Sequence, residues 1–312
     1  MANTTTGNVM TSGSLGEMIT RAAIRVFESN LYFAKMGKMA KLPVGYNKYT
    51  FPTIDESVAA AALTEGTTPS EGSFSITNVE VTLTQFGGYA ILSDVLLTDA
   101  PVDVVIEASV EAARQVAEAF DADVQDVIDA GTNVIYGGDA TARTEIAAGD
   151  TMTSTLLAKS VNLLRANDAP KWDGGYYAAI MHPHVFHDLQ VESGTGTYID
   201  LHKYDTPEAL FKWETGALFG ARVLVSSNVQ FYTDGGASTV DSYPTYVFGR
   251  DAYGVVMSGD IQTIFQTTGS AGTADPLNQR ATVAGKIRGK AAILKQAALY
   301  RIETSSSLGA NA

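Results

Sequence analysis

The chain has 312 residues, of which 45% are hydrophobic, and its formal net charge is −13. This length and apolar fraction predict a globular protein with one large domain or two ordinary ones. The absence of cysteine excludes disulfides and thiol catalysis, and the acidic balance argues against a protein that wraps nucleic acid over most of its surface. The sequence has neither a secretory leader nor a long uncharged apolar stretch, so we expect no export and no membrane partner.

Charge is distributed along the chain in blocks of alternating sign. Residues 1–48 have six basic and two acidic side chains, whereas residues 49–102 have seven acidic side chains and no basic one. Residues 103–130 carry eight carboxylates against one arginine, and residues 273–303 carry six cations against two carboxylates. A single block of this kind is usual on a solvated face, but four alternating blocks indicate surfaces that meet one another.

The N-terminal region is predicted to be a mobile arm followed by a helix. The first dozen residues are polar and show no periodicity. Ser14 precedes Glu17 at the spacing of a capping box, which predicts a helix that begins there and ends at Pro43.

Residues 44–98 are predicted to form a long β-hairpin. The strand Tyr46–Ile54 contains Pro52, which places it at a sheet edge, and the alternation within Phe74–Leu92 predicts the returning strand. The residues between the two strands are rich in glycine and polar side chains, which is typical of a tip that buries little. An isolated ribbon of this length is not stable, so we expect it to lie on another surface.

The clearest predicted helix spans residues 102–130, with apolar residues at helical spacing, and it would be roughly 40 Å long. Because helices and strands then mix without regular alternation, the expected fold class is α+β. The elements expected after the long helix are a helix over Thr153–Ala166, a strand over Tyr176–Met181, a short helix over Pro183–Leu189, strands over Ala221–Ser226, Thr245–Phe248 and Gly254–Met257, and a closing strand pair through TVAGKIRGKAAIL and ALYRIET.

Five strings carry a resemblance to a known family. They are LTEGTTPSEG (63–72), VTLTQFGGYAILSD (81–94), YAAIMHP (177–183), GALFGARVLVSSNV (216–229) and DPLNQRATVAGKIRGKAAIL (275–294). With the order of elements, they resemble the major capsid proteins of tailed bacteriophages with the Hong Kong 97 fold, most closely the family typified by phage N-four. The likeness covers nearly the whole chain.

The resemblance implies a structural subunit that catalyses no reaction and needs no cofactor. It implies self-assembly into hexamers and pentamers of an icosahedral virion capsid in the host cytoplasm, with double-stranded DNA on the inner face, and with a portal and scaffold or decoration proteins as further partners. The implied divisions are an arm and helix (1–43), an extended loop (44–98), a spine helix with the peripheral domain (99–175), a mainly axial domain (176–260) and C-terminal strands returning to the peripheral domain (261–312).

The sequence departs from the type member of the fold in two respects. In that protein a lysine on the extended loop forms an isopeptide link to another subunit, but residues 49–102 here contain no lysine. Only about a dozen residues precede the first predicted helix, which implies a separate scaffold protein or none. The residues expected at inter-subunit contacts are Arg21, Arg25, Glu65, Gly66, Thr67, Thr68, Pro69, Glu71, Lys286, Arg288 and Lys290.

The string HPHVFH is the most enzyme-like feature, because His182, His184 and His187 lie within six residues. Imidazoles at this density can bind zinc, copper or nickel. The competing interpretation is structural, with His182 ending a strand and Pro183 opening a helix. A metalloenzyme site would need a further ligand with a general base, as in HExxH, and none is present.

The string GKIRGK lacks the spacing and the trailing hydroxyl of a phosphate-binding loop. It predicts a strand with Lys286, Arg288 and Lys290 on one face and Val283, Gly285, Ile287 and Gly289 on the other. The cation row could meet a neighbour's acidic hairpin or the packaged genome, and charge alone leaves both open. Two other functions also remain open, a cellular nanocompartment shell of the same fold and a metal-dependent enzyme that uses the histidine cluster.

Overall fold

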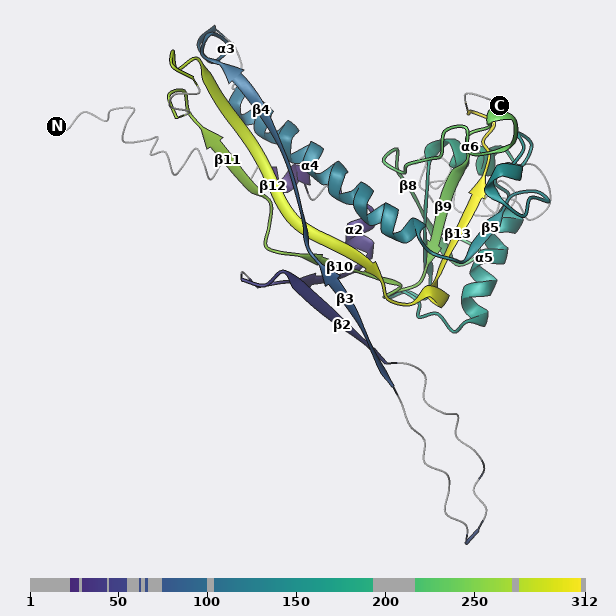
Figure 1. Ribbon diagram of the computed structural model, residues 1–312. Helices are drawn as coiled ribbons and strands as arrows, with labels where there is room; N and C mark the ends of the chain where they lie inside the picture. The colour runs from purple at the N-terminus through teal and green to yellow at the C-terminus, as the bar shows by residue number, and fades with distance from the viewer. Residues whose placement is uncertain are drawn as a thin grey trace, which may run out of the picture.

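The computed structural model of the protein contains two lobes, each built on one sheet, and a two-stranded ribbon that projects from the first lobe (Figure 1). The described residues are 23–27, 30–43, 45–54, 62, 65–66, 75–99, 104–192, 217–270 and 275–309. In this part of the chain no helix is both long and apolar enough to cross a membrane.

The first lobe is an elongated sheet centred on β12 (Arg280–Ile293), which pairs with three strands. Strand β4 runs antiparallel to it from Ser93 opposite Arg280 to Thr84 opposite Gly289. Its other partners are β10 and β11, and β1 extends the sheet beside β10. The bounds are β1 Lys38–Lys41, β4 Thr84–Ser93, β10 Tyr253–Met257 and β11 Gln262–Gln266.

One face of this sheet is covered by α4 (Val104–Asp129), which confirms the long predicted helix (Figure 1). The helix buries a stripe that includes Ala112, Val116 and Phe120. Glycines of β12 let the helix approach closely, since a Cβ atom added to Gly289 would stand 2.5 Å from the Phe120 ring. Helix α3 (Asp94–Asp99) follows β4 at the far end of this lobe.

The second lobe has a six-stranded sheet in the order β5-β13-β9-β6-β8-β7. It contains the predicted helices α5 (Ser154–Ala166) and α6 (Pro183–Val191), and strands β6, β8 and β9 also confirm the sequence analysis. The strand bounds are β5 Val134–Tyr136, β6 Tyr177–Met181, β7 Ala217–Leu218, β8 Ala221–Val225, β9 Tyr243–Phe248 and β13 Leu299–Thr304.

The ribbon consists of β2 (Lys48–Ile54) and β3 (Ile76–Thr82), paired in antiparallel register. Its base is anchored by Phe51 and Val81, which pack on Val256 of β10. Only this base is buried, and the ribbon then extends away from both lobes (Figure 1). The predicted hairpin is therefore shorter than expected, because β4 leaves it to join β12 in the main sheet.

Two further predictions are wrong. The single helix expected to end at Pro43 is interrupted: residues 23–27 are helical, α2 covers only Phe33–Met36, and the chain then forms β1. The expected pairing of the last two strands is also wrong, since β12 and β13 lie in different sheets. Their burial explains this, because β12 alternates between a buried and a more open face whereas β13 is almost fully buried between β5 and β9.

Candidate assembly surfaces

The ribbon is the first candidate surface. Beyond Phe51 and Val81 its described side chains are mostly exposed, and Ile76 is 57% exposed. Lys48 and Glu80 form an ion pair across the two strands. Exposure of both faces means that the ribbon gains little stability from its own chain.

The expected contact residues at the tip are only partly described. Glu65 and Gly66 form an exposed turn, and Gly66 has a φ of +76°, in the region that favours glycine. Thr67, Thr68, Pro69 and Glu71 lie outside the described residues, as does Arg21. Arg25 is exposed on the helical segment 23–27.

The second candidate surface is the face of the first sheet opposite α4, which we call the open face. It presents Tyr89, Ile91 and Ile264, which are 69%, 53% and 39% exposed. The register places Tyr89 and Ile264 on either side of Ala284, so these residues form a continuous apolar row across three strands. Within the described chain this row has no covering layer.

The basic residues of β12 lie next to this row. Lys286, Arg288 and Lys290 alternate with buried Gly285, Ile287 and Gly289, as the sequence pattern predicts. Lys290, however, is not free, since its ammonium group lies 2.6 Å from Asp123 Oδ1 of α4. Lys286 and Arg288 instead line a cavity of about 240 Å³.

The histidine cluster serves the second lobe structurally. His182 Nδ1 accepts a hydrogen bond from the His184 backbone N–H at 3.2 Å and so caps α6, with Pro183 at the start of the helix. His184 Nδ1 lies 3.2 Å from the Tyr243 hydroxyl. Among the described residues no group of three His, Asp or Glu side chains is placed to hold a metal ion, and His202 lies outside them.

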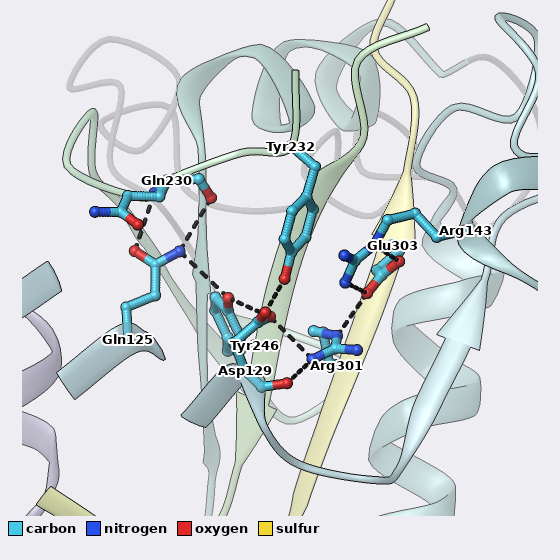
Figure 2. A network of polar contacts seen from close by, with 8 residues as sticks. All are labelled: Gln125, Asp129, Arg143, Gln230, Tyr232, Tyr246, Arg301 and Glu303. Atoms are coloured by element: carbon cyan, nitrogen blue, oxygen red, sulfur yellow. Dashed lines mark hydrogen bonds and ion pairs between the residues drawn. The ribbon is translucent and has the colours of Figure 1, made fainter. Parts of the chain in front are cut away.

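A buried polar network joins the two lobes where α4 ends (Figure 2). Asp129, the last residue of α4, accepts hydrogen bonds from the hydroxyls of Tyr232 and Tyr246. Arg301 of β13 donates to both the side chain and the carbonyl oxygen of Asp129. The guanidinium thus satisfies a carbonyl at the helix end, where cations are favoured.

Glu303 extends the same network on β13 (Figure 2). Its fully buried carboxylate accepts two hydrogen bonds from Arg143, at 2.7 and 2.8 Å, and lies 2.6 Å from Arg301 Nε. The Arg143 guanidinium also stacks 3.3 Å from the centre of the Tyr232 ring. Sequence reasoning missed this network, and the only available signal was two charged residues within an otherwise apolar strand.

A second buried carboxylate anchors the N-terminal region to α4. Asp121 of α4 accepts hydrogen bonds from the backbone N–H groups of Tyr32, Phe33 and Ala34. Burial raises the pKa of Asp121, while these three N–H groups act in the opposite direction. The contact fixes the start of α2, whose N-terminal N–H groups would otherwise lack partners.

No protein-family model and no curated protein matches the chain. Solved structures, by contrast, are similar to the chain. The capsid of Ralstonia phage GP4 aligns over 90% of this chain and 91% of its own, with a TM-score of 0.70 and 16% identity. The fold is that of phage capsid proteins. The capsid of cyanophage Pam1 aligns over 84% of this chain and 86% of its own (TM-score 0.65, 15% identity).

A virus-like particle from Pyrococcus furiosus is also similar, over 92% of this chain and 99% of its own, with a TM-score of 0.55 and 12% identity. These three likenesses cover 84–92% of this chain and 86–99% of the similar chains. They confirm the predicted mixed helix and sheet architecture. At such low identities the shared property is the fold, and function is argued from the surfaces described above.

Proposed function

We propose that the chain is the major capsid protein of a tailed bacteriophage, a subunit that assembles with copies of itself into an icosahedral head around the genome. The observation that carries this proposal is the combination of the capsid fold with a ribbon that leaves its own subunit. A ribbon exposed on both faces needs a surface to rest on, and the open face of the first sheet needs a cover.

The arrangement of these two surfaces favours a closed assembly. The ribbon and the open face are different parts of the molecule, so contact between them is heterologous. Heterologous contacts generate rings when the rotation closes, which is what hexamers and pentamers require. The proposed contacts between subunits are Arg21, Arg25, the cation row of β12, and the residues Glu65, Gly66, Thr67, Thr68, Pro69 and Glu71.

The proposal includes the finer expectations from the sequence. We propose that the first lobe corresponds to the peripheral domain and the second to the axial domain, and that the nearest relatives are the capsid proteins typified by phage N-four. The expected bounds then shift, because β5 and α5 (expected within 99–175) and β13 (expected within 261–312) belong to the second lobe, whereas β10 (expected within 176–260) belongs to the first. Double-stranded DNA, a portal and a scaffold or decoration protein are the proposed partners, and the virion, assembled in the host cytoplasm, is the proposed location. A non-enzymatic role is supported by the use of His182 and His184 in a helix cap and ring contacts.

Electron microscopy of the chain expressed alone and with its neighbouring genes tests the proposal. A large shell that fills with DNA when the packaging proteins are present is the expected result. The alternative function is a cellular nanocompartment, and the likeness to the Pyrococcus furiosus particle is the reason to test it. It predicts a small shell with protein cargo. A chain that never assembles would contradict both.

A further inference from the structure

The open face contains a cavity of about 240 Å³ in which two cations are exposed to a ligand. Lys286 and Arg288 line it from neighbouring outward positions of β12. The register of the sheet sets a neutral amide beside each cation, since Gln262 lies opposite Lys286 and Gln85 lies opposite Arg288. Amides and cations together offer several hydrogen-bond donors to an anion.

Both cations lack an ion-pair partner within the described part of the chain. Asp260 also lines the cavity, but its carboxylate lies 3.4 Å from Lys41 Nζ, so its charge is offset there. Lys290, the third cation of the row, is held by Asp123. The cavity therefore keeps a net positive character that the subunit itself does not neutralise.

The surroundings of the cavity favour a protein ligand over nucleic acid. The apolar row of Tyr89, Ile91 and Ile264 adjoins it on the same face. An apolar centre with charged groups at its margin is the usual make-up of a protein–protein interface. Nucleic-acid interfaces are far more positively charged and more polar than this face.

The chain itself supplies a matching partner. Residues 49–102 contain seven carboxylates and no cation. Among the described ones, Glu80 is paired with Lys48 on the ribbon, whereas Glu65 is exposed in the turn beyond it. The ribbon extends away from its own open face, so a second copy must provide it (Figure 1). We infer that the cavity of Lys286, Arg288, Gln85 and Gln262 is a carboxylate-binding site that receives the acidic turn at Glu65, beyond the ribbon, of a second copy of this chain.

This inference rests on the proposed capsid function and adds the site and the ligand chemistry. The test uses two variants of the full chain. Lys286→Glu with Arg288→Glu reverses the cavity, and Glu65→Lys with Glu71→Lys reverses the ribbon. Each double substitution alone places like charges at the contact between two copies. It should lower the yield of shells at least about tenfold, because like charges that face each other across an interface are strongly unfavourable. All four substitutions in one chain should restore assembly.

Mixing the two double variants gives a second readout that one misfolded subunit cannot mimic. Each ribbon then meets a complementary cavity only on the other variant, so the two should sediment together as small oligomers of both chains. The two variants can alternate around a six-membered ring but not around a five-membered one. Pentamers should therefore not form, and closed shells should stay rare. Absence of any joint oligomer would contradict contact between the two surfaces.

Lys159→Glu with Lys171→Glu is the matched control, since it makes the same charge change on exposed residues of the second lobe. This control should assemble like the wild type. Normal shells from the Lys286 and Arg288 variant would overturn the inference, and normal shells with less DNA would assign the face to nucleic acid instead. If the wild type itself formed no shells, the proposed function would fail together with this site.

Discussion

Gly289 of β12 lies directly against the ring of Phe120 in α4. A Cβ atom at Gly289 would stand 2.5 Å from Phe120 Cε2 and 3.0 Å from the backbone oxygen of Val256. The absence of a side chain at this position therefore sets how closely α4 can approach the sheet. Gly285, four residues earlier on the same buried face, leaves ordinary contact distances, with its nearest neighbours at 3.5 Å.

This difference predicts that Gly289→Ala destabilises the subunit and Gly285→Ala does not. Overpacking at Gly289 should lower the free energy of unfolding by about 1–3 kcal/mol, because both the ring and the backbone oxygen must move. Urea unfolding of the unassembled chain measures it. Equal stability of the two variants would show that α4 can shift away from β12 without cost.

Glu303→Gln is predicted to loosen the junction between the two lobes. The fully buried carboxylate of Glu303 offsets the charges of Arg143 and Arg301, and removing it leaves both cations short of a partner. The free energy of unfolding should fall by on the order of 3 kcal/mol.

Arg114→Ala is the control for charge loss. Arg114 pairs with Glu111 and Glu118 on the exposed surface of α4, where water already solvates all three groups. Its unfolding midpoint should match that of the wild type. An equal loss of unfolding free energy in Glu303→Gln and Arg114→Ala would mean that the buried network stabilises the subunit no more than an exposed ion pair does.

His182 is predicted to give the subunit a specific pH dependence. Burial, together with the nearby charge of His184, lowers the pKa of His182 from 6.5 to about 4. The unfolded chain therefore takes up this proton at a higher pH than the folded chain does. The contribution to stability is fully present above about pH 6.5 and is lost as the pH falls through about 4.

His182→Asn removes this titration and keeps a side-chain acceptor for the His184 backbone N–H. The free energy of unfolding of the variant should fall less than that of the wild type between pH 6.5 and 4. Denaturant unfolding at several pH values in this window makes the comparison. Parallel curves for the two proteins would contradict the lowered pKa.

Deletion of residues 59–72 is predicted to leave the subunit folded and to abolish stable shells. The described residues of this segment, Ala62, Glu65 and Gly66, are all exposed and contribute nothing to a core. Circular dichroism and thermal unfolding should match the wild type, while electron microscopy should show no shells. A scrambled tip of the same length and composition separates the effect of sequence from that of length, and normal capsids from the deletion would exclude a role for the tip.

Much of the fold is predictable from sequence because its long elements have clear periods. Helix α4 shows a repeated apolar stripe, and β12 shows strict alternation with Lys286 and Arg288 outward. The signal for Asp121 was also present, since this carboxylate follows Phe120 within the apolar stripe. An acidic residue on the buried face of a helix indicates a partner that the helix itself does not supply.

The sheet partners were not predictable, because they depend on contacts far apart in the chain. Strand β13 follows β12 in sequence, yet it pairs with β5 and β9, more than fifty residues away. Local pattern sets the period of a strand but not its neighbour. For the same reason the contact of Arg301 with Asp129 was not predictable, since these residues are 172 positions apart in the sequence.

Sedimentation velocity of the purified wild-type chain at micromolar concentration shows directly whether the subunit assembles with copies of itself. We expect capsomers or closed shells, weakened by molar salt because exposed charge pairs are screened beyond roughly 3 Å at that ionic strength. A stable monomer under every salt condition would contradict it.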